Sequence, residues 1–378
     1  MLIPNEPTTH TIPTVSPSLY ETLIGCPARA SWYANGPRDA VAPHPSALLG
    51  TCFHAVMEGL QRGVIAGEDD EERRVAARKI FDELAAKIHS EAHPLIRVKF
   101  PSPERLPYYN LLRERAAVVA GSYSPIADRP ERDDGARSPI AEMRFESSDR
   151  VIVGRPDLID VARGEVVDYK TGQPAAEEAY RVSDREARQL RLYAYLAAQT
   201  GIAVTRGTIV RSNGDTASID VSKDTADQEA EQARKLLSEF NSAIADGQSF
   251  YDVAHPSAPV CRFCPCIPFC EPFWASVEPS WGEECGCHLE GTVRSVEPAN
   301  VQGTDLLTIE VDAERGTVRD CVASIEQVPT AWVLADGDRF PQPRDTIRLI
   351  DARLVSSEPP VLRADRVMTS LWRLGDEA

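Results

Sequence analysis

Charged side chains lie inside two apolar β-segments that follow each other closely in the chain. Asp157 belongs to the segment Val151–Val161, and Asp168 and Lys170 belong to the segment Glu165–Lys170. Successive side chains on a strand alternate between faces, so Asp168 and Lys170 share a side, and a tight turn between the strands lets Asp157 join them. Because unpaired charges are costly among apolar residues, this pattern favours a chemical site over an exposed salt bridge.

Two carboxylates beside an ammonium group are typical of a metal-dependent hydrolytic site. Mg²⁺ or Mn²⁺ takes a few carboxylate ligands, and water and substrate phosphate fill the remaining positions. A lysine there can position or activate the attacking water and offset the phosphate charge. We therefore interpret Asp157, Asp168 and Lys170 as a phosphodiester-cleaving arrangement. Asp160 does not belong to it, because on a regular strand it faces away from Asp157.

The composition is that of a globular protein with an acidic balance. The 378 residues include 41 Lys plus Arg and 58 Asp plus Glu, a formal net charge of -17. This charge argues against indiscriminate polyanion binding but allows a local basic groove. No apolar run reaches the length of a membrane helix and the N-terminus lacks a signal-peptide pattern, so we expect a cytoplasmic protein without membrane contact. The sequence has no Gly-Lys pair, so it lacks a P-loop.

The order of helix and strand signals predicts an α/β fold. Residues 121–138 are rich in Pro, Gly, Asp and Arg without apolar periodicity, and we interpret them as a loop. The predicted helices cover residues 16–26, 46–60, 70–89, 185–200 and 225–246, and the predicted strands are Ile140–Glu146, Val151–Val161, Glu165–Lys170 and Val204–Arg211.

The C-terminal residues 285–378 differ from the rest of the chain. They contain no lysine and have five β-segments in roughly ninety residues, which predicts a separate small β-barrel of OB type. Such barrels bind single strands by stacking bases on aromatic side chains, but here the aromatics are few, namely Trp332, Phe340 and Trp372. Two roles therefore remain open for this barrel. It can bind DNA, or it can dock a protein partner or brace the neighbouring domain. The predicted barrel strands are 289–296, 306–312, 318–323, 346–355 and 361–370.

Two further polar pairs have helical spacing. His54 and Glu58 lie one turn apart in the pattern Gly50-x3-His54-x3-Glu58, although an isolated helix histidine is usually structural. Gln189 and Tyr193 have the same spacing on the predicted helix 185–200. Gln189 can orient a phosphate or a water, whereas core packing is the more frequent role of a lone tyrosine.

The chain has nine cysteines. Because disulfides are rare in the reducing cytosol, these cysteines are better explained as metal ligands than as disulfides. Cys261, Cys264 and Cys270 form a C-x2-C-x5-C group, and Cys26 lies more than two hundred residues earlier. Together they can hold a 4Fe-4S cluster or Zn²⁺. Cys266 departs from this minimal pattern, and a zinc site formed with Cys266 in place of Cys26 is also possible.

Taken in order, these motifs resemble the RecB-type branch of the PD-(D/E)XK nuclease superfamily. The resemblance covers about residues 16–275 and implies a restriction-endonuclease-like core, a mixed central sheet flanked by helices, within a nuclease domain of residues 1–280. Glu142 is a weaker candidate, because its spacing is less diagnostic. The motifs that carry the resemblance are Gly50–Glu58 with its histidine, Gly154-Arg155-Pro156-Asp157, Asp168-Tyr169-Lys170 and Gln189–Tyr193.

The resemblance also implies roles for the matching residues. Asp157 and Asp168 would bind the Mg²⁺ or Mn²⁺, and His54 would be a further ligand or organise water. Lys170 would be the catalytic lysine, and Gln189 and Tyr193 would support the site and the DNA.

The cysteines resemble the iron-sulfur variant of the same branch, which occurs in AddB-type helicase-nuclease subunits and CRISPR adaptation nucleases. The resemblance assigns Cys26, Cys261, Cys264 and Cys270 to a structural 4Fe-4S cluster. This cluster would tie the first helix to the end of the nuclease domain.

We therefore expect a metal-dependent DNA nuclease, an exonuclease on single-stranded DNA or DNA ends, with repair and antiviral defence among the pathways that use such domains. RNA is not excluded, because nothing in the sequence reads the 2′-hydroxyl. Without a P-loop, the chain would depend on a separate helicase or other protein partner for strand separation. The alternative is a non-catalytic nucleic-acid-binding or scaffolding subunit of a helicase-nuclease or defence complex. The retained Asp157, Asp168 and Lys170 favour the enzyme.

Overall fold

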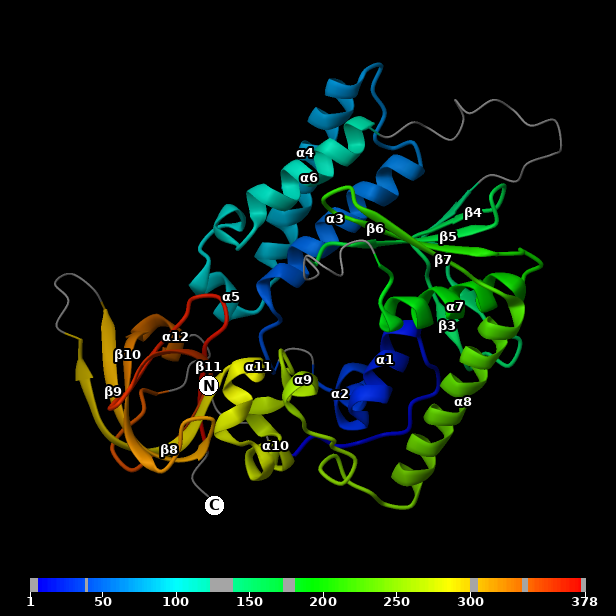
Figure 1. Cartoon of the computed structure of the whole chain (residues 1–378). Helices are drawn as coiled ribbons and strands as arrows, with labels where there is room; N and C mark the ends of the chain where they lie inside the picture. The colour runs from blue at the N-terminus through cyan, green and yellow to red at the C-terminus, as the bar shows by residue number, and fades with distance from the viewer. Residues whose placement is uncertain are drawn as a thin grey trace.

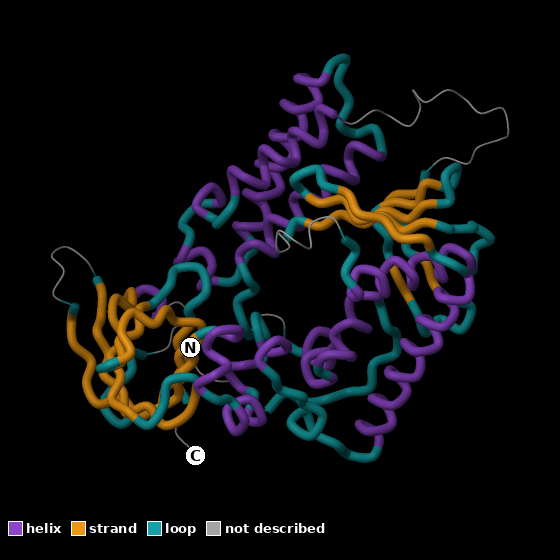
Figure 2. Tube along the Cα trace, in the orientation of Figure 1, coloured by secondary structure: helices purple, strands orange, loops and turns teal. Residues whose placement is uncertain are grey.

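The computed structural model describes residues 6–37, 40–122, 139–172, 181–299, 305–334 and 339–374. Two separate β-structures lie on opposite sides of the molecule, with most of the helices around and between them (Figures 1 and 2). One is an open mixed sheet, and the other is a C-terminal barrel. The expected α/β core with a small barrel is therefore confirmed.

The chain begins with an extended lead-in and two short helices. Helix α1 (Pro17–Gly25) begins at Ser16, whose side chain accepts a hydrogen bond from the backbone N–H of Leu19, and a proline occupies the first helical position. Cys26 has an extended backbone and precedes Pro27, so it ends α1 where α2 (Pro27–Asn35) begins. The predicted end of the first helix near Cys26 is confirmed, whereas the helix α2 that follows it was not predicted.

A helical layer covers one face of the open sheet. Buried Phe53, Phe81 and Leu112 from three of its helices share a core with Val167 and Tyr169 of the sheet. The predicted helices 46–60 and 70–89 are confirmed, whereas a helix at 109–122 was not predicted. The layer consists of α3 (Pro45–Gln61), α4 (Asp70–Ser90), α5 (Pro94–Lys99), the short 3-10 helix Pro103–Arg105 and α6 (Tyr109–Ser122).

The open sheet has the strand order β1-β4-β5-β6-β7. β5 and β6 pair in parallel, and the other pairs are antiparallel. Helix α7 (Asp184–Ala198) connects β5 to β6 and packs with α8 (Lys223–Ala245) on the face opposite the helical layer, where Val166, Leu190 and Ile209 are fully buried. The strands are β1 (Ile140–Ala141), β4 (Leu158–Asp160), β5 (Glu165–Lys170), β6 (Arg206–Arg211) and β7 (Thr216–Asp220).

Two predicted strands are wrong in their extent, because each is split. The segment 140–146 forms β1 and β2 (Phe145–Glu146), since Glu142 has a φ of 52°, which an extended strand does not allow. The segment 151–161 forms β3 (Val153–Gly154) and β4, since Pro156 has no N–H for a strand ladder. β2 and β3 pair with each other in a separate two-stranded sheet. Of the predicted loop 121–138, residues 121–122 end α6 and the rest lies outside the described residues.

The C-terminal barrel is a closed ring of five strands. The ring order is β12-β10-β9-β8-β11, with β12 paired back to β11 and with β10 and β12 parallel. The closed five-stranded ring is that of the expected OB-type barrel. The strands are β8 (Cys287–Pro298), β9 (Leu306–Gly316), β10 (Cys321–Pro329), β11 (Thr346–Ser357), β12 (Pro360–Arg363) and β13 (Ser370–Arg373), the last on the edge of β11, and α12 (Thr330–Leu334) follows β10.

Two barrel strands differ from their predictions. Residues 318–320 belong to a turn, because Gly316 and Asp320 have φ values of 121° and 58°, and β10 begins only at Cys321. The predicted strand 361–370 is split into β12 and β13 by a loop in which the Asp365 carboxylate accepts backbone N–H bonds.

The barrel is joined to the cysteine-rich segment by a buried ion network. Arg348 of β11 is 1% exposed, donates to the Pro268 carbonyl at 2.6 Å and bonds Glu290 and Glu271. The expected division into residues 1–280 and 285–378 therefore crosses a packed polar interface. Between the sheet and the barrel lie α9 (Ala258–Cys261), the 3-10 helices Ile267–Phe269 and Pro279–Trp281, α10 (Glu271–Ser276) and α11 (Gly282–Cys285).

A membrane-crossing helix is not found in the described part of the chain, where every helix is too short or too polar.

Candidate active site

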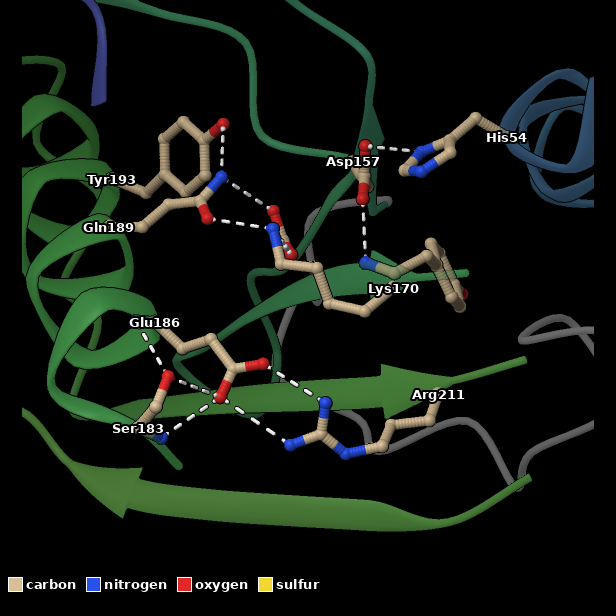
Figure 3. A network of polar contacts seen from close by, with 10 residues as sticks. His54, Asp157, Lys170, Ser183, Glu186, Gln189, Tyr193 and Arg211 are labelled. Carbon is tan, nitrogen blue, oxygen red and sulfur yellow. Dashed lines mark hydrogen bonds and ion pairs between the residues drawn. The ribbon is translucent and has the colours of Figure 1, made fainter. Parts of the chain in front are cut away.

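The hairpin of β4 and β5 brings the predicted residues together. Asp157 precedes β4, and its Oδ2 accepts a hydrogen bond of 2.6 Å from the backbone N–H of Tyr169 on β5. Its other oxygen, Oδ1, lies 3.2 Å from Nδ1 of His54 on α3. Asp157 therefore connects the helical layer to the centre of the sheet (Figure 3).

The alternation predicted for β5 is observed. Asp168 and Lys170 both point to the α7 side, where Lys170 Nζ lies 2.7 Å from Asp168 Oδ2. Tyr169 points the other way and accepts a hydrogen bond from Gln61 of α3. Asp160 stays outside the site, because its carboxylate accepts the Arg163 N–H in the hairpin turn.

Gln189 connects the lysine, the aspartate and the tyrosine (Figure 3). Its Oε1 accepts a hydrogen bond of 2.7 Å from Lys170 Nζ. Its Nε2 donates to Asp168 Oδ1 at 2.9 Å and to the Tyr193 hydroxyl at 3.2 Å. One amide thus fixes the orientation of the lysine and of the carboxylate at the same time.

The backbone around the site is shaped by close packing of α7. A Cβ on Gly154 would lie 2.6 Å from Leu196 and 3.1 Å from the Tyr193 ring, so a glycine lets β3 approach the helix. The Ser183 and Glu186 capping box begins α7, and Glu186 also pairs with Arg211 of β6. These contacts fix the position of α7 over β5. Gln189 lies about one helical turn after Glu186, so its position relative to β5 is fixed as well.

Glu142 belongs to the site more closely than its spacing indicated. The ligand atoms of His54, Glu142 and Asp157 all lie within 4.8 Å of one another. Asp168 is not part of this group, and its carboxylate contacts Lys170 and Gln189. The positive φ of Glu142 is the local reason for its position, and the sequence carries no signal for that conformation.

Burial and neighbouring charge shift several pKa values toward neutrality. Burial raises the pKa of Asp168 to about 6, with Lys170 opposing and Asp157 adding to the rise. Burial and the charge of Asp157 raise the pKa of Glu142 to about 7. Burial lowers the pKa of His54, but the hydrogen bond and charge of Asp157 outweigh it, so the pKa lies above its usual value. Such shifts are typical of functional sites.

A family model described as the PD-(D/E)XK nuclease superfamily matches residues 14–271, more than half of the chain. The chain belongs to this superfamily. Pro156-Asp157 and Asp168-Tyr169-Lys170 carry the letters of the PD-(D/E)XK motif, and both parts meet at the hairpin just described.

Solved structures give a further comparison for this PD-(D/E)XK protein. One match is titled "Crystal structure of SSO0001"; it is 17% identical over 60% of this chain and 95% of that chain, with a TM-score of 0.27. The comparison with curated proteins gives no match.

The cysteines predicted to bind a cofactor line one small buried cavity. Its wall includes Cys26, Cys261, Cys264 and Cys270, and Cys266 lies in the same wall. The backbone N–H of His255 also donates to Cys26 Sγ at 3.4 Å. The fold therefore brings Cys26 next to cysteines that lie more than two hundred residues later in the chain.

Burial raises the pKa of most of these thiols, Cys270 to about 12. Cys264 differs, since the Cys266 hydrogen bond lowers its pKa against the effect of burial.

Proposed function

We propose that this chain is a metal-dependent DNA nuclease that hydrolyses phosphodiester bonds of single-stranded DNA or at DNA ends. The observation that carries the proposal is the convergence of His54, Glu142 and Asp157 within 4.8 Å, next to the Asp168–Lys170 pair. Membership of the PD-(D/E)XK superfamily supports nucleic acid as the substrate class.

The donor set suits Mg²⁺ or Mn²⁺. Carboxylates are the preferred ligands of both ions, and one imidazole is acceptable to Mn²⁺. The Asp168 carboxylate is buried and its Oδ2 pairs with the Lys170 ammonium group at 2.7 Å, so a bound cation would share this carboxylate with the lysine. We propose Asp157, Asp168 and His54 as ligands and add Glu142. A divalent ion bound by these residues would polarise the phosphate and lower the pKa of a bound water.

We propose Lys170 as the catalytic lysine. Its ammonium group is held between Asp168 Oδ2 and Gln189 Oε1, each at 2.7 Å, so its direction is fixed before substrate binds. The side chain is 31% exposed and can therefore meet a phosphate oxygen or an attacking water. Gln189 positions it, and Tyr193 supports Gln189 from a largely buried place.

We propose that Cys26, Cys261, Cys264 and Cys270 hold a structural 4Fe-4S cluster. These four cysteines line one cavity, so the fold brings together the thiols that a cluster needs. Zinc held in the same cavity is the alternative. Backbone N–H groups directed at the thiols, as at Cys26, also favour bound thiolates.

The division into a nuclease domain of residues 1–280 and a barrel of residues 285–378 is part of the proposal. The Arg348 network supports a bracing role for the barrel, because it fixes β11 to the segment that carries the cysteines. A separate helicase or other protein partner would supply single strands, since the chain has no P-loop.

The test compares linear and circular single-stranded DNA of the same sequence in Mg²⁺. We expect the linear strand to be degraded and the circle to resist, and EDTA to stop the reaction. Cleavage of both would correct the proposal to an endonuclease. Cleavage of neither, with DNA still bound, would favour the non-catalytic scaffolding subunit.

A further inference from the structure

Exposed aromatic side chains line two cavities, one of which begins next to Lys170. Within the described residues, the aromatic side chains classed as exposed are Tyr33 at 43%, Tyr108 at 62% and Phe263 at 55%. Tyr33 and Phe263 line a cavity of about 490 Å³. Tyr108 lines a second cavity of about 290 Å³. Every exposed aromatic of the described chain therefore faces one of these two hollows.

The smaller cavity lies next to Lys170, and the larger cavity lies beyond it. Thr171 and Gly172, which come directly after the lysine, line the smaller cavity together with the start of α6. Ser46 lines the same cavity, whereas its neighbours Pro45 and Ala47 line the larger one. The first turn of α3 therefore separates two consecutive hollows, and the further one ends at the cysteine loop and the barrel.

Guanidinium groups accompany the exposed rings. Arg29 lies 5.5 Å from the Tyr33 ring centroid, and Arg262 lies 5.0 Å from that of Phe263. Arg115 lines the smaller cavity beside Tyr108 and donates to Ser212. An aromatic ring with an adjacent arginine is the pairing that single-strand binding proteins use for bases and phosphates.

Two of these rings are held on strained backbone. Tyr108 has a φ of 67° and Phe263 a φ of 60°, in the left-handed region that favours glycine. Exposed bulky residues gain little from burial that could offset this cost. Strain of this kind persists mainly at binding and catalytic sites.

We propose that the two cavities bind consecutive parts of one single-stranded DNA substrate, with bases stacked on Tyr108, Phe263 and Tyr33. Arg115, which lines the smaller cavity, faces the phosphates. Asp351 also lines the larger cavity, where a carboxylate suits the amino groups of bases. A duplex hides its base faces and does not fit this surface. The inference rests on the proposed nuclease function, because the strand path leads to Lys170.

The experiment measures the affinity of the full chain for a 24-nucleotide oligothymidylate and for a 24-base-pair duplex in EDTA. The variants are Tyr108→Gly and Phe263→Gly, since glycine relieves the positive φ and favours correct folding. Val118→Ala is the matched control, an exposed side chain at 54% on α6 that lines neither cavity. Phe263→Tyr tests rescue by a ring.

We expect each glycine variant to bind the single strand about tenfold more weakly, the value of one stacked base. Duplex affinity should not change, and the Val118→Ala and Phe263→Tyr variants should bind like the parent chain. Single-strand affinity within twofold of the parent in both glycine variants would overturn the inference, as would an equal loss on duplex.

Hydrolysis in Mg²⁺ separates this inference from the nuclease proposal. In one outcome, the parent chain fails to cleave DNA while the glycine variants lose single-strand affinity. This result would refute the nuclease proposal and support the single-strand binding site. A parent chain that cleaves, with variants that bind normally, would refute the strand site alone.

Discussion

The acidic site and the cysteine cavity are built in opposite ways. The acidic site combines α3, one hairpin and α7, and its His54 and Lys170 side chains are 33% and 31% exposed. The cysteine cavity joins Cys26 to the segment 261–270, and most of its thiols are buried. An open site of ionisable groups suits hydrolysis, which needs water. A closed cavity of thiols suits a structural metal that joins two distant segments of the chain.

The pKa shifts sharpen this contrast. In the acidic site, the pKa values of Glu142 and Asp168 are raised to about 7 and about 6, so both carboxyl groups titrate near neutral pH. Burial raises the pKa of Cys26 and Cys270 away from neutral pH, so these thiols lose their protons only to a bound metal. Changes in the two regions should therefore have different readouts, activity in the first and stability in the second.

The largest expected effect on stability is that of Cys26→Ala. The cluster of the anaerobically purified chain should be lost, together with its brown colour, and Tm should fall on the order of 10 °C, because metal binding contributes folding free energy. Iron content, visible absorption and thermal unfolding measure this.

Two cysteine controls identify the ligands. Cys52→Ala removes a buried thiol outside the cavity and should keep the colour and most of the stability. Cys266→Ala should also keep the iron. Loss of the metal in Cys266→Ala but not in Cys26→Ala, with stoichiometric zinc in the parent chain, would contradict the cluster assignment.

A smaller effect is expected from Glu142→Gln, which tests whether the acidic site extends beyond the residues that spacing predicts. Loss of one carboxylate should weaken Mn²⁺ binding about tenfold or more, without lowering Tm in EDTA. Titration calorimetry with Mn²⁺ measures the affinity. Glu146→Gln, an exposed carboxylate on β2, is the control. Equal affinities in the two variants would remove Glu142 from the site.

The smallest effect is a pH dependence of stability. Asp168 and Glu142 have folded pKa values of about 6 and about 7, above their ordinary 3.8 and 4.5, so the metal-free folded chain holds protons that the unfolded chain releases. Their contribution to stability is therefore present at low pH and lost as pH rises through these values. We expect Asp168→Asn to raise Tm in EDTA by about 2–4 °C at about pH 8, with less effect at about pH 5. Mg²⁺ should stabilise the parent chain more at the higher pH, and the opposite order would contradict these shifts.

Much of the acidic site was predictable because it depends on local periodicity. The alternation along β5 places Asp168 and Lys170 on one side, and the helical spacing of Gln189 and Tyr193 aims both at that side. Glu142 was underestimated, because a positive φ moves it into the site and residue type does not reveal this conformation.

The barrel shows where sequence patterns stop being sufficient. Its five-stranded ring follows from alternating apolar segments, but the bounds of β10 depend on turns at Gly316 and Asp320. The buried pairing of Arg348 with Glu290 and Glu271 joins distant segments, and a charged residue in a strand normally indicates a solvent-facing position. Such long-range pairs need the three-dimensional arrangement.

The most direct test of the central claim is the rate of Mg²⁺-dependent cleavage of linear single-stranded DNA by Lys170→Ala. We predict a loss of about 10²–10⁴-fold with nearly unchanged DNA binding, because the lysine acts on the reacting groups and not on the strand. Lys223→Ala, an exposed lysine outside the site, should cleave like the parent chain. Cleavage by Lys170→Ala at the parent rate would contradict the assignment of this hairpin as the active site.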